Sequence, residues 1–243
     1  MSAPELLAFT ALAALAGSFV QSAGGFGYAI VCMSVWPLFL PFRTASILEA
    51  VTAFFMVVYI AVRLRKAIRW RALWPPVLAS LACGWLGVDT LMRLDDAVLR
   101  RILGASLLVL ACYFLFLSEK VRLKGGIAAG LAAGAVSGFC GGLFNIGGPP
   151  AVAYFLAVAR SKEEYNATLQ AYFCLTTLNI FGVHFLRGNV TAAMLPLFAA
   201  ALAGVGAGTL LVFAVFRRLT MQDIRKFIYG FMTAAGLYLL LRG

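Results

Sequence analysis

Stretches of about 20 apolar residues recur along the chain from end to end, separated by short polar or basic segments. A helix rises about 1.5 Å per residue, so about 20 apolar residues cross the hydrocarbon core of a bilayer, which is about 30 Å thick. The pattern therefore predicts an all-α integral membrane protein. The expected apolar segments cover residues 5–22, 26–41, 44–62, 72–91, 98–117, 125–142, 147–159, 165–186, 190–215 and 224–241.

Two of these segments, 26–41 and 147–159, are short, and each lies at a glycine-rich stretch. The first stretch reads Gln-Ser-Ala-Gly-Gly-Phe-Gly over residues 21–27, and the second reads Gly-Gly-Leu-Phe-Asn-Ile-Gly-Gly-Pro-Pro over residues 141–150. As a helix, 147–159 would reach only about 20 Å. We therefore expect both short segments to be half-helices of re-entrant hairpins, each preceded by a helix that stops near the break.

Composition supports a membrane protein over a soluble one. Hydrophobic residues make up 63% of the chain and charged residues 12%, whereas soluble domains are about half apolar and about a quarter charged. No polar stretch is long enough for a separate soluble domain, so we expect a single membrane domain over 1–243. The first apolar stretch lacks a basic segment before it and a small-residue cleavage site, which predicts a retained helix and not a signal peptide.

The net charge of +11 comes from basic residues that cluster at the ends of apolar segments. This placement follows the positive-inside rule and favours anionic lipid headgroups, and it argues against a nucleic-acid partner. The clusters are Arg63, Arg65, Lys66, Arg69 and Arg71, then Lys120, Arg122 and Lys124, and finally Arg217 and Arg218.

Assigning the basic loops to the cytoplasm determines the remaining topology. The loops expected inside are 63–71, 118–124, 160–164 and 216–222, and those expected outside are 92–97 and 187–189. The segment 125–159 must then begin and end on the same side, as a re-entrant hairpin does. Both termini are expected outside, and the halves 1–118 and 124–243 have opposite orientations. The charge rule thus predicts an inverted repeat, in which each half holds one broken hairpin and about three further transmembrane helices.

The sequence also repeats weakly between the two halves. Residues 94–101 align with 219–226, and each stretch leads into an apolar segment that contains glycine and a tyrosine. Residues 24–25 of the first break align with 147–148 of the second. This shared frame at matching distances from both breaks favours a true repeat over the general similarity of apolar helices.

The two breaks are the candidate substrate site. Helix breaks at membrane depth persist only where protein or a water-filled cavity satisfies the backbone, and a matching pair is the best sequence indication of a transporter's binding site. A half-helix beginning at Gly25 or Gly148 presents free N–H groups and the positive end of its dipole, which suit an oxyanion without an arginine at mid-membrane. The expected substrate-binding residues are Gln21, Ser22, Gly24, Gly25, Asn145, Gly147, Gly148 and Gln170.

Close helix packing is the alternative role of glycine in membranes. We expect that role, and no other, for Gly204, Gly206 and Gly208. The five cysteines lie singly in apolar runs without metal-ligand or disulfide spacing, so they are interpreted as packing residues and no metal or cofactor is expected.

Three ionisable residues inside the expected spans, Glu49, Asp89 and His184, are candidates for proton coupling or gating. All three are expected near the outer face. There, a structural role is an equally open alternative, for example an ion pair of Glu49 with Arg43.

The breaks and the Leu-Arg-Arg-Ile-Leu-Gly stretch at 99–104 resemble the sulfite exporter TauE/SafE family over essentially the whole chain. The second break is the most specific part of the resemblance. The first, Gly-Gly-Phe-Gly, departs from the family's fuller Gly-x-Gly-Gly-Gly form. Membership would imply a multi-pass permease of a bacterial-type plasma (inner) membrane that carries sulfur-containing anions such as sulfite, thiosulfate or organosulfonates.

We therefore expect a secondary transporter of a small sulfur-containing anion, bound at the midplane between the two helix breaks, with protons as a candidate coupling ion. A passive anion channel of the same architecture is the open alternative, and the direction of transport and the oligomeric state are open too. An enzyme is not expected, because the only histidine, His184, lies near a span end without a Gly-x-Ser-x-Gly elbow and metal ligands are too few.

The charge rule gives a testable topology. Thiols introduced near residues 2 and 243 should react with a membrane-impermeant reagent added from outside, whereas thiols near residues 67 and 122 should react only after permeabilisation. Because the chain has five native cysteines, each variant is compared with the parent protein. Labelling at residue 67 from the outside would reverse the assignment.

Overall fold

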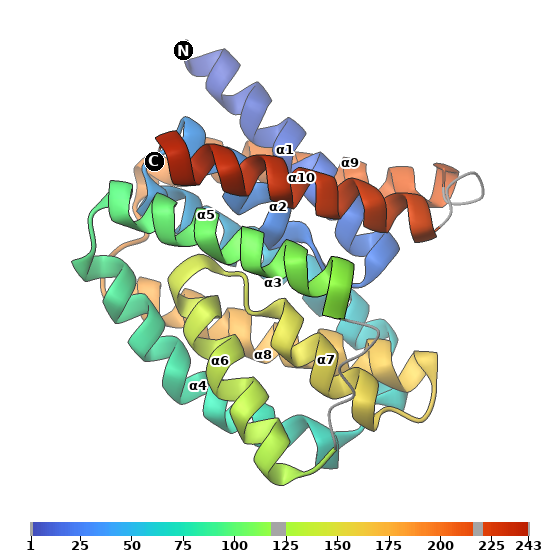
Figure 1. The fold of residues 1–243 in the computed structure, drawn as a ribbon. Helices are drawn as coiled ribbons and strands as arrows, with labels where there is room; N and C mark the ends of the chain where they lie inside the picture. Colours follow the sequence, from blue (N-terminus) through green and yellow to red (C-terminus); the bar gives the residue numbers. More distant parts are fainter. Residues whose placement is uncertain (1, 118–124, 216–220, 243) are drawn as a thin grey trace. The chain divides into compact units, whose positions relative to one another are not determined.

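The computed structural model describes residues 2–117, 125–215 and 221–242 (Figure 1). In this part of the chain almost every residue is helical and no β-strand occurs. The α-helices are α1 (Ala3–Gly24), α2 (Tyr28–Val35), α3 (Phe42–Arg63), α4 (Trp70–Arg93), α5 (Asp96–Cys112), α6 (Ile127–Phe144), α7 (Gly148–Val158), α8 (Lys162–Leu186), α9 (Leu195–Val215) and α10 (Met221–Arg242). Short 3-10 helices η1 (Trp36–Leu38), η2 (Arg65–Ala67) and η4 (Ala192–Met194) and a π-helical segment η3 (Tyr113–Leu117) adjoin them.

Seven helices in the described residues are long and apolar enough to cross a membrane: α1, α3, α4, α5, α6, α8 and α9. The all-helical, multi-span prediction is thus confirmed. The two segments expected to be short are short: α2 has 8 residues and α7 has 11. At about 1.5 Å per residue neither crosses a core of about 30 Å by itself.

The chain divides into two compact units, each assembled from segments of both halves of the sequence. Unit 1 comprises Met1–Thr52, Leu94–Leu117 and Val190–Gly243, and unit 2 comprises Ala53–Arg93 and Ser118–Asn189, so the boundary falls within α3. The units therefore do not coincide with the halves 1–118 and 124–243, whose relation as an inverted repeat stays a prediction.

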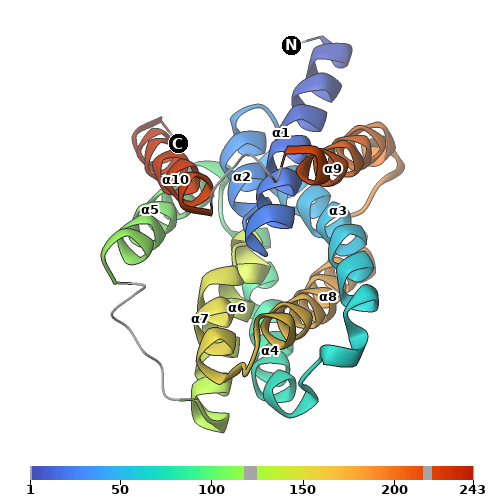
Figure 2. The ribbon, with the colours of Figure 1, turned by 90° about the vertical axis from the view of Figure 1, so that its right-hand side faces the viewer.

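In unit 2, α6 packs along α4 through glycines spaced four residues apart, and both ribbon views show the two helices side by side (Figures 1 and 2). A Cβ atom on Gly134 would lie 2.2 Å from the carbonyl oxygen of Pro76, and one on Gly138 would lie 2.4 Å from that of Ser80. The missing side chains let the two backbones touch, as small residues do between membrane helices.

In unit 1, α9 packs along α1 in the same manner. A Cβ atom on Gly204 would lie 2.2 Å from the carbonyl oxygen of Ala11, and one on Gly208 would lie 2.2 Å from that of Leu15. The packing role expected for these two glycines is confirmed, whereas a Cβ atom on Gly206 would meet nothing within 4 Å. The remaining long contact of this unit joins α5 to α10, which lie side by side in Figure 2.

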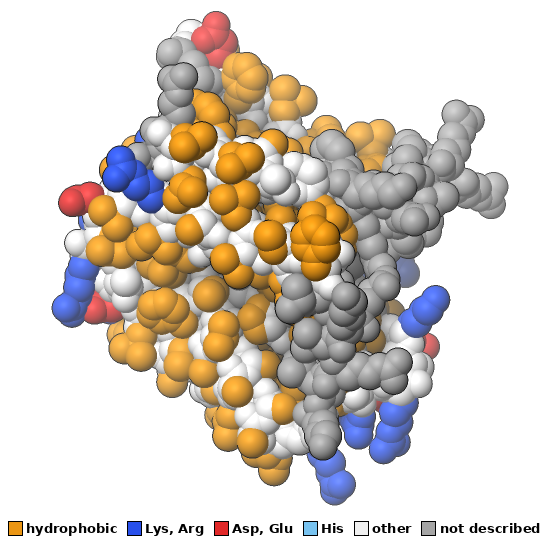
Figure 3. Space-filling view, in the orientation of Figure 1, with side chains coloured by type: hydrophobic (Ala, Val, Ile, Leu, Met, Phe, Trp, Pro, Cys, Tyr) orange, Lys and Arg blue, Asp and Glu red, His pale blue; other side chains and the backbone are white. Residues whose placement is uncertain are grey.

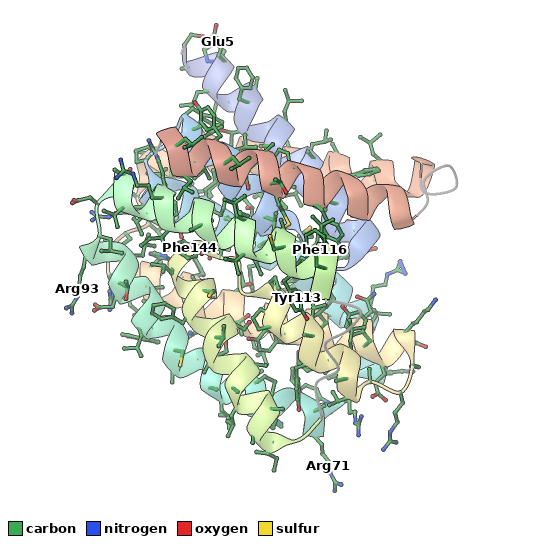
Figure 4. All side chains as sticks on the ribbon, in the orientation of Figure 1. Glu5, Arg71, Arg93, Tyr113, Phe116 and Phe144 are labelled. Atoms are coloured by element: carbon green, nitrogen blue, oxygen red, sulfur yellow. The ribbon has the colours of Figure 1, made fainter. Side chains whose placement is uncertain are left out.

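Contacts within unit 2 join loops that the charge rule assigns to the same side of the membrane. Arg69 pairs with Glu164 at 3.4 Å, which brings the loop 63–71 beside 160–164. Arg187 pairs with Asp89 at 3.2 Å at the other end of α4, and Figure 4 shows Arg71 and Arg93 at these opposite ends.

Unit 1 shows the same agreement between charge rule and contacts. The backbone N–H of Phe42 donates to the Asp96 carboxylate at 2.9 Å, so the loop before α3 lies beside the loop before α5, both expected outside. The basic residues of 118–124 and those at 217 and 218 lie outside the described residues. Which end faces the cytoplasm therefore stays a prediction.

Hydrophobic side chains cover the outward surfaces of individual helices. In the face shown in Figure 3 they spread over α5 in unit 1 and over α4 and α6 in unit 2, while charged side chains lie at its borders. On α4 the large exposed apolar residues are Trp70, Trp74, Leu78, Trp85 and Leu86. An apolar surface of this kind suits contact with lipid acyl chains.

The seam between α4 and α6 predicts a difference between two glycines of unit 2. Gly138→Ala should lower the thermal unfolding temperature and the monodisperse yield, because the new Cβ atom would lie 2.4 Å from the carbonyl oxygen of Ser80. Gly182→Ala is the matched control, since a Cβ atom there meets nothing within 4 Å and alanine favours a helix by about 1 kcal/mol. Equal unfolding temperatures for the two variants would contradict a close seam.

Candidate functional site: the two helix breaks

The first break joins α1 to α2 within unit 1. α1 ends at Gly24, and Gly25 adopts a left-handed conformation (φ 81°) in which its N–H donates to the carbonyl oxygen of Gln21 at 2.7 Å. Gly27, with φ 123°, then precedes Tyr28, the first residue of α2. Residues with a side chain rarely adopt such angles, so glycine is needed on both sides of the turn.

The second break joins α6 to α7 within unit 2. Asn145 ends α6 in a left-handed conformation (φ 61°), and its N–H donates to the carbonyl oxygen of Gly141 at 2.8 Å. Asparagine is one of the few residues besides glycine that tolerate this conformation. Gly147 follows, and α7 begins at Gly148, as expected from the sequence. A Cβ atom on Gly147 would lie 2.2 Å from the carbonyl oxygen of Ser137, so only glycine fits there.

The two breaks share one construction: a left-handed residue, one apolar residue, and a glycine that precedes the next helix. By this construction Gly25 corresponds to Asn145, and Gly27 to Gly147. The expectation that a half-helix begins at Gly25 is therefore wrong, because Gly25 ends α1 and α2 begins at Tyr28. Gly27 is absent from the expected binding residues, and the parallel between Gly-Phe-Gly and Asn-Ile-Gly is the signal that identifies it.

The first turn of α2 presents two free backbone N–H groups. Its first amide, that of Tyr28, donates to the side-chain oxygen of Gln21 at 3.0 Å. Within the described residues, the N–H groups of Ala29 and Ile30 have no acceptor at hydrogen-bond distance. Gln21 is buried, with 5% of its surface exposed. It caps α2 with its oxygen, so its NH2 group is the part left to donate elsewhere.

The first turn of α7 presents a single free N–H, that of Gly148, which has no acceptor in the part of the chain that the structure describes. The next two residues are Pro149 and Pro150, which carry no N–H. Both prolines lie in the first turn, where their fixed φ angles favour the helix and no intrahelical hydrogen bond is lost.

Two further expected residues of unit 1 belong to the surroundings of the first break. The buried hydroxyl oxygen of Ser22 has no hydrogen-bond partner in the described part of the chain. Glu49, on α3, is 3% exposed, and its carboxyl lies within electrostatic range of Tyr28 and Cys32 of α2. No ion pair involves Glu49 among the described residues. The alternative in which it pairs with Arg43 is therefore contradicted.

Gln170, the remaining expected binding residue, lies on α8 in unit 2 and is buried. Its side-chain NH2 donates to Asn166 at 3.4 Å, one helical turn earlier. Tyr172, two residues further along α8, lies much closer to the second break, because its hydroxyl contacts Ser137 of α6 at 2.7 Å. The sequence analysis does not identify Tyr172 or Ser137, and no local pattern marks two residues that meet from different helices.

Asp89 and His184 both lie at the end of unit 2 where α4 and α8 stop. Asp89 pairs with Arg93 at 2.7 Å and with Arg187 at 3.2 Å. His184 is fully buried, and its Nδ1 lies 3.2 Å from the side-chain nitrogen of Asn189. The structure thus brings these two candidates to one end of the unit.

The opposite ends of α4 and α8 are joined as well. There the Arg69 guanidinium pairs with Glu164 and donates to the carbonyl oxygen of Val158, and the Arg69 backbone N–H donates to Thr168 at 3.0 Å. In this structure, contacts thus hold α4 and α8 together at both ends. The contacts therefore favour a clamp between α4 and α8, and a gating role for Asp89 stays a prediction.

Comparison with known proteins agrees with the resemblance seen in the sequence. Residues 9–239 match the family model described as Sulfite exporter TauE/SafE, whereas no curated protein and no solved structure gives a significant match. The match covers both breaks, most of α1 and the other six helices of membrane-spanning length in the described residues. The chain therefore belongs to the sulfite exporter TauE/SafE family, a family of membrane transporters of sulfur-containing anions and not of enzymes.

Proposed function

We propose that this protein is a secondary transporter that moves a small sulfur-containing anion, such as sulfite, thiosulfate or an organosulfonate, across the plasma membrane. The family match over residues 9–239 carries the proposal. Seven helices of spanning length supply the membrane domain, and the two breaks supply polar backbone inside it. Their arrangement around one anion stays a prediction, so each break is judged by its own donors.

The free N–H groups at the two breaks support binding of an oxyanion. In the first turns of the two helices they belong to Ala29 and Ile30 of α2 and to Gly148 of α7. A helix start carries about half a positive charge, worth about 0.3–1 kcal/mol to a nearby anion and up to about 2 kcal/mol in a partly buried site. The several oxygens of a sulfur oxyanion can accept hydrogen bonds from more than one such donor.

Neutral side chains extend this set of donors. Gln21 has its NH2 group, Ser22 has its unpartnered hydroxyl, and Asn145 lies at the turn of the second break. No lysine or arginine occurs in 17–31 or 137–154, the segments around the breaks. A cation there would cost at least about 2.5–3.5 kcal/mol at the bilayer centre. Helix ends and neutral amides supply positive potential without that cost.

Variants of the second break test the binding site. Asn145→Gly removes the amide without strain, because glycine readily adopts φ 61°. It should weaken sulfite and thiosulfate binding about fivefold, the equivalent of one hydrogen bond of about 1 kcal/mol. Gly148→Val should abolish transport while leaving expression and monodispersity largely intact. Binding is measured as the rise in unfolding temperature of purified protein with sulfite, thiosulfate, sulfoacetate, taurine, sulfate or chloride.

Unchanged affinity in both variants would reduce the second break to a packing element. A purified protein that no sulfur-containing anion stabilises would contradict the proposed substrate class. Accelerated exchange of labelled anion against excess unlabelled anion in proteoliposomes separates a carrier from a passive channel, because only a carrier couples the two movements.

Glu49 is the candidate for proton coupling in unit 1. Glu49→Gln keeps size and hydrogen bonding but cannot titrate, so it should uncouple transport from a pH gradient while preserving binding and exchange. Arg43→Gln is the matched control and should leave coupling intact, because Arg43 forms no ion pair with Glu49 in the described residues. Transport by Glu49→Gln at the parent's rate and pH dependence would eliminate Glu49 as the proton carrier.

A further inference from the structure

We infer that three buried hydroxyl groups in unit 2, those of Ser80, Tyr172 and Ser137, form a positioning chain that aims the N–H of Gly148, the one amide N–H among the first three residues of α7, at the anion. The inference rests on the proposed function and adds residues that lie outside the break itself. Its three members come from α4, α8 and α6, and each is at most 2% exposed.

The positioning chain of hydroxyl groups ends on the backbone of the second break. The Tyr172 hydroxyl lies 2.7 Å from the Ser137 hydroxyl oxygen and 3.0 Å from that of Ser80. Ser137 in turn donates to the carbonyl oxygen of Gly147. A carbonyl oxygen only accepts hydrogen bonds, so the hydrogen of Ser137 is committed to Gly147.

The number of hydroxyl hydrogens available determines which group donates in each of these hydrogen bonds. Because Ser137 has already used its hydrogen, it can only accept from Tyr172. Tyr172 has one hydrogen, and its hydroxyl is the donor toward both Ser137, at 2.7 Å, and Ser80, at 3.0 Å. The sequence of donations therefore runs from Tyr172 through Ser137 to Gly147, and Ser80 is a second acceptor for the Tyr172 hydroxyl.

Ser137 differs from most hydroxyl-bearing residues on the described helices. The common arrangement is a hydrogen bond to a carbonyl oxygen of the same helix three or four residues earlier, which Ser and Thr side chains make readily. Thr10, Ser34, Thr52, Thr90, Thr168 and Thr176 all do so. Ser137 instead reaches a carbonyl ten residues further along the chain. The contact with Tyr172 favours that orientation, since it holds the Ser137 oxygen from the other side.

A hydrogen bond to the Gly147 carbonyl also sets the direction of the Gly148 N–H. The two groups belong to one planar peptide unit and point in opposite directions across it. Holding the carbonyl towards Ser137 therefore turns the N–H of Gly148 away from α6. Glycine on both sides of this peptide gives it the least steric resistance to flipping over. Since Pro149 and Pro150 offer no replacement donor, a flip would leave the first turn of α7 without any N–H for an anion.

Tyr172→Phe tests the positioning chain with the loss of one oxygen atom. Sulfite and thiosulfate should bind roughly two- to tenfold more weakly, the range of a lost hydrogen bond. Tyr154→Phe is the matched control, because Tyr154 is a buried tyrosine of α7 in the same unit whose hydroxyl makes no hydrogen bond among the described residues. It should bind both anions as the parent does. Affinity is read from the anion-dependent rise in unfolding temperature and from the KM of transport in proteoliposomes.

A double variant separates positioning from simple stabilisation. If Tyr172 acts through Ser137, Ser137→Ala should weaken binding, and adding Tyr172→Phe should weaken it no further. A purely structural Tyr172 would instead lower the unfolding temperature without anion and leave affinity and KM unchanged, which would overturn the inference. If Asn145→Gly weakens binding but Tyr172→Phe binds as the parent does, the positioning role of Tyr172 is overturned and the proposed function is not. A parent protein that binds neither anion would overturn the proposed function as well.

Discussion

Backbone polar groups inside a membrane must find partners within the protein, and this constraint shapes the whole molecule. Along the long helices, intrahelical hydrogen bonds satisfy the backbone N–H and C=O groups. Glycines then let pairs of helices pack with their backbones in contact, as α6 does on α4 and α9 on α1. At the two breaks only some of the backbone polar groups have hydrogen-bond partners. Left-handed residues return one N–H to each preceding helix, Gln21 caps the start of α2, and Ser137 satisfies the carbonyl of Gly147. What remains unpaired is a small set of N–H groups.

The two breaks leave different donors free although their construction is the same. At α2 the first amide is capped by Gln21, and the second and third are free. At α7 the first amide is free, and prolines remove the second and third. The first turn of α2 thus offers a pair of adjacent donors and the first turn of α7 a single one. Each pattern needs its own support, which Gln21 provides within α1 and which Ser137 provides from α6 with Tyr172 and Ser80 behind it.

The positions and approximate lengths of the helices follow from hydrophobicity, and the short α2 and α7 follow from the glycine-rich stretches before them. The start of α2 cannot be predicted in this way, because glycine is common both at the end of a helix and just before the next one. The positive φ of Gly25 shows that this residue ends α1. Gln21 is expected from the sequence as a donor to the anion, yet its oxygen caps α2, since a side-chain direction depends on the path of the chain after it. The sequence does not indicate Ser137 and Tyr172, because their contact joins two residues that are 35 positions apart and lie on different helices. The interleaved units depend on which helices pack together, and hydropathy carries no information on that.

Charge balance relates Glu49 to the first break, which lies in the same unit. A binding site built from helix ends and neutral amides offers fractional positive charge, so it tolerates a monoanion better than a dianion, whose desolvation cost grows with the square of its charge. An ionised Glu49 beside α2 would oppose the anion at the first break, and a protonated Glu49 would not. If the first break binds the anion, we expect binding to be stronger when Glu49 carries a proton, and by thermodynamic reciprocity a bound anion would favour that proton by the same free energy. Such a pair would cross the membrane interior with less net charge than the anion alone, which is a physical reason for a carboxyl group that has no ion-pair partner among the residues the structure describes.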